Sequence, residues 1–316
     1  MTPGPCLRAR NGALRPALAL LACALCLAPA AAVPAQPVDE PLRVTVAYST
    51  RSFFQVDTDD ARTAARIWID RTVKSSIPGS EIRTELFDSL EKLEKSVRSG
   101  SVDVTGLDPD EFLELSSRLP LEPAFVTAGE EGPYLTILIV VRKDRGARSL
   151  ADLRGTRFNV SRTAGGSWQP VWLDTVLLRG GFSEAASFFS SVRVVSQPSQ
   201  ALLPVFFGQA DACLVTREAF KLAVELNPQI GETLTPLATS PPYVGSIIAF
   251  RPGLDRRARE RMTKIMSTLG SDPDGRQLLT LFRRSRLVPF QPEYLETTRT
   301  LLAEYRTLRE RAARRR

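Results

Sequence analysis

Residues 135–141 read Leu-Thr-Ile-Leu-Ile-Val-Val and form a continuous apolar run near the middle of the chain. A short run without any charge is typical of a strand that is buried on both faces of a sheet. Predicted strands and helices alternate before this run, and the same alternation starts again after it. Such alternation predicts β-α-β units with mainly parallel strands. The run therefore separates two similar α/β blocks.

The two blocks and a helical tail account for nearly all of the chain after residue 42. Strands are predicted at 43–49, 82–87, 102–107, 135–141, 156–161, 192–195, 212–216 and 245–250. Helices are predicted at 59–75, 90–97, 109–119, 166–178, 199–207, 218–226, 257–269, 275–282 and 293–311. The fold class is therefore α/β, with mixed but mostly parallel sheets flanked by helices and a C-terminal helical segment.

The N-terminus has the pattern of an export signal. Arg8, Arg10 and Arg15 precede an uninterrupted apolar segment over 17–28, and small residues follow as far as Ala35. This order predicts a signal peptide over residues 1–35, because the apolar segment is too short for a comfortable membrane span. Leu20-Leu21-Ala22-Cys23 resembles a lipid-attachment site, but the sequence stays apolar after Cys23, which favours simple cleavage.

Composition excludes several kinds of chemistry. The chain has no histidine, so Ser/His and Cys/His nucleophiles and the commonest metal ligand are missing. Cys213 is the single cysteine after the predicted signal, and its apolar neighbours indicate a buried side chain. The basic residues of the chain include a cluster at the C-terminal end, which is typical of a solvated helix terminus and not of a nucleic-acid-binding face. We expect no enzyme activity, cofactor, metal or nucleic-acid partner.

Polar turns at the carboxyl ends of the predicted strands are the candidate binding site, because ligands of open α/β sheets bind there. The candidate residues in these turns are Ser49, Thr50, Arg51, Ser52, Asp108, Arg162, Thr163, Gly165, Gly166, Ser167, Thr216 and Arg217. Glycines, hydroxyls and helix N-termini supply the donors that a small anion needs. Trp168 and Tyr243 are candidates for the wall of the same cleft.

Each candidate has a structural alternative. Ser and Thr before helices are commonly N-caps, and arginines such as Arg162 and Arg217 are commonly surface charges. Trp168 and Trp172 lie four residues apart, a spacing more typical of a helix face in the core. The negative charge of Asp108 does not fit a purely anionic ligand, so a ligand that also carries a cationic or hydroxyl group stays possible.

Three motifs follow one another along the chain, G-x-V-D-V at 100–104, S-x-x-D-L-x-G at 149–155 and G-x-x-D-A at 208–212. Together they resemble the phosphonate-binding (PhnD-like) group of periplasmic binding proteins of ABC importers. The resemblance implies a type II periplasmic binding protein with two lobes and ligand capture by hinge closure. It places one lobe at 43–129 plus 250–316, the other at 142–242, and the crossing segments at 130–141 and 243–249. Residues 108–112 and 163–167 differ from the family pattern, so the identity of the ligand stays open.

The expected function is that of a periplasmic solute-binding component of an ABC-type importer, a monomer that captures a small anionic solute and presents it to a membrane permease. Three alternatives stay open. A sensory module would hand occupancy to a membrane sensor, and a sulfonate or TRAP-type subunit would bind a related solute. A secreted α/β enzyme is disfavoured by the lack of histidine, although carboxylates and lysine can still do acid–base work.

Overall fold

The computed structural model describes residues 41–53, 59–60, 63, 66–67, 79–162, 168–281 and 284–314. Glu40–Arg316 forms one compact unit of the chain. The predicted signal peptide and most of the predicted helix at 59–75 lie outside the described residues. Within the described part, no helix has both the length and the apolar composition of a membrane span.

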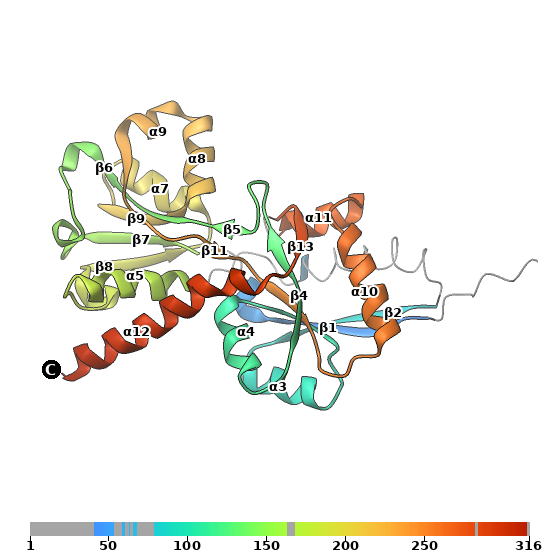
Figure 1. Cartoon of the computed structure of the whole chain (residues 1–316). Coiled ribbons are helices and arrows are strands. Elements are labelled where there is room, and N and C mark those ends of the chain that lie inside the picture. The colour runs from blue at the N-terminus through green and yellow to red at the C-terminus, as the bar shows by residue number, and fades with distance from the viewer. Residues whose placement is uncertain are drawn as a thin grey trace, which may run out of the picture. The chain divides into compact units, whose positions relative to one another are not determined.

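Six strands form the first sheet in the order β13-β4-β12-β3-β1-β2 (Figure 1). Their bounds are β1 Arg43–Ser49, β2 Glu81–Phe87, β3 Val104–Leu107, β4 Glu122–Ala128, β12 Ile247–Phe250 and β13 Arg286–Pro289. β1 pairs in parallel with β2 and β3, whereas β12 runs antiparallel to β3 and β4. The carboxyl ends of β1 and β3 therefore meet at one edge of this sheet.

Helices cover both faces of the first sheet because its strands are apolar on both sides. α3 (Leu90–Arg98) and α4 (Pro109–Ser116) pack on the face that carries Ile247 and Ala249. α10 (Arg256–Thr268) and α11 (Pro273–Leu281) pack on the opposite face, which carries Ile248 and Phe250. Adjacent residues of β12 thus belong to two different cores, as the alternation of side chains along a strand requires.

Five strands form the second sheet in the order β10-β6-β9-β7-β8 (Figure 1). Their bounds are β6 Ile137–Arg142, β7 Arg157–Ser161, β8 Ser191–Val195, β9 Ala212–Thr216 and β10 Leu234–Thr239. β7 pairs in parallel with β8 and β9, and β6 runs antiparallel to β9 and β10. The flanking helices are α5 Trp168–Arg179, α6 Ala185–Phe188, α7 Pro198–Phe206, α8 Arg217–Leu226 and α9 Pro228–Thr233.

The apolar run 135–141 supplies β6, and both of its faces are buried. Ile137 and Ile139 pack with residues of α5, whereas Leu138 and Val140 pack with residues of α7. The prediction of a strand buried on both faces is therefore confirmed, although Thr136 interrupts it and separates β6 from β5 (Tyr134–Leu135).

The chain passes between the two sheets twice. β5 connects β4 to β6, and β11 (Tyr243–Val244) connects β10 to β12. The two connecting strands form an antiparallel pair of their own, in which Tyr243 lies opposite Leu135. The two crossings therefore run side by side as one narrow ribbon between the sheets.

Two aspartates from the motifs at 100–104 and 208–212 play the same part in the two sheets. The Thr45 N–H of β1 donates to Asp103 Oδ2 at 2.9 Å, and the Arg157 N–H of β7 donates to Asp211 Oδ2 at 2.9 Å. Asp103 also pairs with Arg251 at 2.9 Å. Each aspartate thus satisfies a backbone donor in the N-terminal part of a parallel strand, so these motif residues hold the strands in place.

The α/β fold class is confirmed, with two sheets that mix parallel and antiparallel pairs, but three strands of these sheets were not predicted. β4, β10 and β13 contain Pro123, Pro236 and Pro289. Proline lowers the strand signal because it cannot donate to a ladder, and it is tolerated at edges and bulges. β10 and β13 are edge strands, and the pairing of β12 with β4 is irregular at Pro123.

The last helix, α12 (Glu296–Arg314), follows the short η5 (Pro292–Leu295) and contacts the second half of the molecule (Figure 1). Leu301 joins the core that α5 forms with the second sheet. Arg179 of α5 donates to both carboxylate oxygens of Glu304, at 2.7 and 2.8 Å. The lobe boundaries at 43–129 plus 250–316 and at 142–242 stay predictions, with α12 packed across them.

Candidate functional site

The end of β1 and the start of α4 bring three predicted site residues together. Ser49 ends β1, Arg51 lies in η1 (Thr50–Phe53), and Asp108 is the N-cap of α4. Ser49 Oγ donates to Glu111 Oε1 at 2.7 Å, and the Asp108 N–H donates to Glu111 Oε2 at 3.2 Å. Arg51 Nη1 lies 3.6 Å from Glu111 Oε1, and Arg51 Nη2 lies 3.2 Å from Asp110 Oδ2.

Glu111 was not predicted as a site residue, but it contacts all three of these residues. Its side chain is only 1% exposed. Burial and the neighbouring charge of Asp108 raise the pKa of Glu111 to about 7, while Ser49 and Arg51 oppose the rise. The carboxyl group therefore changes charge in the neutral range, next to an arginine that is half exposed.

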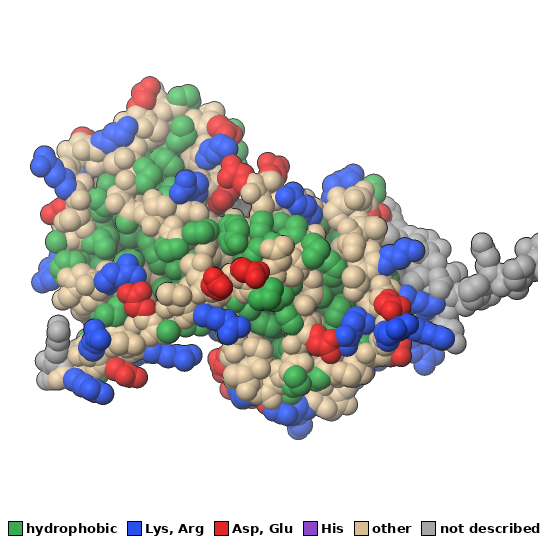
Figure 2. Space-filling model, viewed as in Figure 1, with side chains coloured by type: hydrophobic (Ala, Val, Ile, Leu, Met, Phe, Trp, Pro, Cys, Tyr) green, Lys and Arg blue, Asp and Glu red, His purple; other side chains and the backbone are tan. Residues whose placement is uncertain are grey.

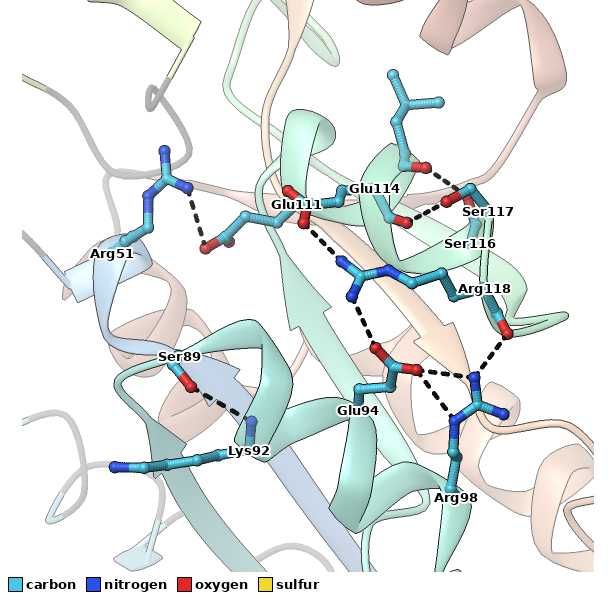
Figure 3. Close-up of polar contacts among 11 residues, drawn as sticks. Arg51, Ser89, Lys92, Glu94, Arg98, Glu111, Glu114, Ser116, Ser117 and Arg118 are labelled. Atoms are coloured by element: carbon cyan, nitrogen blue, oxygen red, sulfur yellow. Dashed lines mark hydrogen bonds and ion pairs between the residues drawn. The ribbon is translucent and has the colours of Figure 1, made fainter.

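A network of exposed ion pairs fixes α4 against α3. Glu94 accepts from Arg98 on its own helix and from Arg118 beyond α4, and Arg118 also pairs with Glu114 (Figure 3). Figure 3 also shows Arg51 facing Glu111 on the side of α4 away from this network. The network links α3 with the C-terminal end of α4.

The second sheet contributes Arg162, which directly follows β7. The guanidinium is partly buried, and the nearby charge of Arg51 adds to burial in lowering the pKa of Arg162, whereas Asp108 raises it. Arg162 therefore lies within electrostatic range of two site residues from the first sheet. Of the predicted residues, Arg51, Asp108 and Arg162 are brought together from both halves.

Arg284 completes this group, although no sequence pattern had selected it as a site residue. It lies between α11 and β13, and burial lowers the pKa of Arg284 to about 10, with Glu218 and Asp108 raising it. A Cβ on Gly245 would lie 3.1 Å from Arg284 Nη2 and 2.5 Å from Thr127 Oγ1. Gly245 thus leaves the space that the guanidinium occupies. We refer to Arg51, Asp108, Glu111, Arg162 and Arg284 as the charge cluster.

The other predicted residues lie differently. Thr216 is the N-cap of α8 and accepts from the Ala219 N–H at 3.1 Å. Arg217 is exposed, and its charge helps to lower the pKa of Glu131 on the β4–β5 hairpin. Thr50 is exposed in η1. The side chain of Ser52 and all of Thr163, Gly165, Gly166 and Ser167 lie outside the described residues.

Trp168 and Tyr243 were expected to wall the cleft, and the structure gives them a core position instead. Trp168 is 0% exposed and Tyr243 is 2% exposed. Their ring centroids lie 4.0 Å apart, within the core formed by α5 and the second sheet. Both rings pack against apolar residues of α5 and the second sheet. The interpretation of Trp168 and Trp172 as one buried helix face therefore describes them better than a role in the wall of a ligand cleft.

A cavity of about 1070 Å³ adjoins the charge cluster. It is lined by α7, α8, α9, the β4–β5 hairpin, α11 and the segment with Arg284. Glu218 and Thr216 of the second half also line it. Figure 2 shows side chains of both charge signs where the surface is indented between α8 and the hairpin. The cavity therefore joins residues of both halves.

The chemistry of this site suits binding of an anion better than metal coordination. The described residues hold no group of three or more His, Cys, Asp or Glu side chains that could ligate a metal ion. Guanidinium groups present planar forks that match oxoanions. Cys213 is buried, and burial raises the pKa of its thiol, which keeps it protonated.

Comparisons with solved structures find the same fold in several binding proteins. A binding-protein component of an ABC phosphonate transporter from Pseudomonas aeruginosa is 14% identical, aligns over 87% of this chain and 99% of its own, and has a TM-score of 0.55. PhnD1 from Prochlorococcus marinus, in complex with methylphosphonate, is 16% identical, aligns over 83% of this chain and 97% of its own, and has a TM-score of 0.53. The protein XAC2383 from Xanthomonas citri, bound to ATP, is 17% identical, aligns over 85% of this chain and 98% of its own, and has a TM-score of 0.57.

At these identities the solved structures show the fold, which is that of the type II periplasmic binding proteins. The family follows from the sequence: a model described as ABC transporter, phosphonate, periplasmic substrate-binding protein matches residues 66–295. The chain belongs to this family and is a solute-binding component of an ABC-type importer. No curated protein matches the chain.

Proposed function

We propose that this chain is exported by the signal peptide over residues 1–35 and captures a small oxoanion at the charge cluster, between its two halves. Closure about the β5–β11 ribbon would bury the bound anion and form the surface that a membrane permease recognises. Binding without catalysis is part of the proposal, because the family model that matches the chain describes a substrate-binding protein of a transporter.

One observation carries this proposal. Arg51 and Arg162 come from different sheets, yet the charge of Arg51 lowers the pKa of Arg162. Like charges that are held near one another favour an anion between them, since the anion relieves their repulsion. The charge of Asp108 opposes the lowering of the pKa of both Arg162 and Arg284, so both guanidinium groups lie within electrostatic range of Asp108.

Isothermal titration calorimetry on the chain from residue 36 onward tests the proposal. The protein is first unfolded, dialysed and refolded, to remove any bound solute, and then titrated with methylphosphonate, phosphite, phosphate, methanesulfonate and acetate. At least one of these anions is expected to bind. Arg162→Ala is expected to weaken that binding about 10- to 100-fold, because a hydrogen bond to a charged group contributes about 1.5–3 kcal/mol.

Arg217→Ala is the matched control, because Arg217 is an exposed arginine that lies outside the charge cluster. Its substitution is expected to leave the affinity unchanged. Equal weakening by the two substitutions would mean that long-range charge alone attracts the anion. A complete lack of binding across the panel would remove the proposed function.

A further inference from the structure

Glu111 is buried beside two groups that the proposed anion site would use. Its Oε1 accepts from Ser49 Oγ at 2.7 Å and lies 3.6 Å from Arg51 Nη1. Its Oε2 accepts from the Asp108 N–H at 3.2 Å. The side chain is only 1% exposed, so the carboxyl group itself has little access to a ligand. An effect of Glu111 on binding therefore passes through Ser49 and Arg51.

The hydroxyl group of Ser49 is engaged while Glu111 is ionised. A serine hydroxyl has one hydrogen to donate and two lone pairs that accept. An ionised carboxylate can only accept, so Ser49 donates its one hydrogen to Glu111 Oε1. Ser49 Oγ also accepts from the Arg51 N–H at 3.3 Å. In this state Ser49 has no hydrogen left for a bound anion.

A proton on Glu111 reverses the direction of this hydrogen bond. The protonated Oε1 becomes a donor, and Ser49 Oγ has a second lone pair that accepts from it. Ser49 then accepts from both Glu111 and the Arg51 N–H, and its own hydrogen becomes available to a ligand. The proton comes from solvent, and no covalent bond of the anion is made or broken.

The same proton changes the charge that Arg51 faces. Ionised Glu111 lies within ion-pair distance of Arg51 and competes with an anion for this guanidinium. Protonation removes that charge and leaves the ion pair of Arg51 Nη2 with Asp110 Oδ2 at 3.2 Å. Arg51 is 47% exposed, so an anion can reach it from solvent. A bound anion and a negative charge on Glu111 therefore oppose each other.

The groups around Glu111 place its change of charge near neutral pH. Burial and the charge of Asp108 raise the pKa of Glu111 to about 7, while Ser49 and Arg51 oppose the rise. The other titratable and charged groups that pack around α4 face partners other than Glu111. They are Asp110 with Arg51, Arg162 and Arg284 with Asp108, Glu94 and Glu114 with Arg118, and Tyr294 with the ring of Tyr134.

We propose that this chain binds its anion in the form in which Glu111 is protonated, so that binding takes up a proton at this residue. Glu111 is a positioning residue: it touches no ligand, and its charge decides whether Ser49 and Arg51 are available to one. This inference rests on the proposed function and adds a proton to its binding reaction. The affinity for the anion should therefore rise as the pH falls through the neutral range.

Calorimetry in buffers of different ionisation enthalpy counts this proton. The probes are the anions of the panel above that bind. The buffers are the cationic amines bis-Tris, imidazole and Tris, because sulfonate and phosphate buffers would compete for the site. If the bound anion raises the pKa of Glu111 by about one unit or more, the wild type takes up about 0.4–0.5 proton there at pH 7. Glu111→Gln cannot take up this proton, and subtraction of its value removes the protonation of the anion itself.

The affinities of the wild type and of Glu111→Gln give a second readout. For the same shift, the ratio of the wild-type affinity to that of Glu111→Gln is expected to fall about five- to tenfold from pH 6 to pH 8. The glutamine amide can donate to Ser49 Oγ as the protonated carboxyl group does. Glu111→Gln is therefore expected to bind the anion about five- to tenfold more tightly than the wild type at pH 8. A loss of structural support would not produce such a gain.

Glu114→Gln is the matched control. Glu114 lies on the same helix, is 57% exposed and pairs with Arg118, away from the charge cluster. This variant is expected to keep the proton uptake and the pH dependence of the wild type.

The outcomes separate this inference from the proposed function. If an anion binds with equal proton uptake in the wild type and in Glu111→Gln, the role of Glu111 is overturned and the anion site stands. Weaker binding by Glu111→Gln at every pH from 6 to 8 would have the same meaning. If no anion of the panel binds at any of these pH values, both proposals fail together.

Discussion

Replacement of Glu111 by glutamine should change how the stability of this protein depends on pH. Glu111 is buried at the N-terminal turn of α4, where it accepts from Ser49 Oγ and from the Asp108 N–H. Burial and the charge of Asp108 raise the pKa of Glu111 from 4.5 to about 7. Glutamine has the same shape and one oxygen that can still accept, but it carries no charge at any pH.

The sign and the magnitude follow from linkage. A carboxyl group whose pKa is higher in the folded state binds more protons there than in the unfolded state between the two pKa values. The stabilisation is fully present below pH 4.5 and is lost as the pH rises through about 7. At 1.36 kcal/mol for each pKa unit, the loss is about 3 kcal/mol of unfolding free energy.

Urea unfolding at half-unit steps from pH 4 to pH 8 measures this effect. The informative quantity is the unfolding free energy of the wild type minus that of Glu111→Gln, because the other titrating groups largely cancel in the difference. This difference is expected to fall by about 3 kcal/mol between about pH 4.5 and 7 and to be constant outside that range. A constant offset from the altered hydrogen bonds does not affect the slope.

Two results would contradict this reasoning. A difference that is constant across the whole range would mean that Glu111 titrates alike in the folded and unfolded chains. A difference that rises with pH would mean that Arg51 and Ser49 outweigh burial. Arg51→Ala is the companion variant, and it should widen the range over which stability is lost, because Arg51 opposes the rise in the pKa of Glu111.

Three further predictions concern the fold. Asp103→Ala should lower the unfolding free energy by about 2–3 kcal/mol in urea titrations, because the Thr45 N–H and Arg251 Nε lose the carboxylate to which they donate. A loss below about 0.5 kcal/mol would show that water replaces the carboxylate as acceptor. Leu301→Ala should cost about 2–4 kcal/mol in the same assay, since Leu301 is buried in the core with α5, whereas a surface position would tolerate the change. Cys213 should react with a thiol reagent only after unfolding, because burial raises its pKa; rapid labelling of the native protein would contradict this.

Much of the fold could be predicted because the deciding residues act locally. The run at 135–141 has the composition of a strand buried on both faces, and the structure buries it so. Strands that contain proline were missed, since β4, β10 and β13 tolerate proline only through edge positions or irregular pairing. That tolerance is a property of the assembled sheet and not of the segment itself.

Less of the site could be predicted, because it depends on which segments the fold brings together. Arg51, Asp108 and Arg162 could be selected as candidates because they follow strands whose ends can be located in the sequence, and they stay predictions as binding residues. Arg284 follows no predicted strand, and its position depends on the space beside Gly245. Trp168 was misplaced because a helix start and a cleft wall look alike until the partner ring of Tyr243 is known.

The position of α12 has a consequence for how the protein is made. The first sheet needs β12 and β13, and the core of the second half needs Leu301, so neither half is complete until nearly the whole chain has been synthesised. Long-range pairings of this kind make folding slow, because distant segments must meet first. A nascent chain is therefore expected to stay incompletely folded until translation is nearly finished, which suits the export that we propose, because a signal peptide directs a chain to machinery that threads unfolded polypeptides.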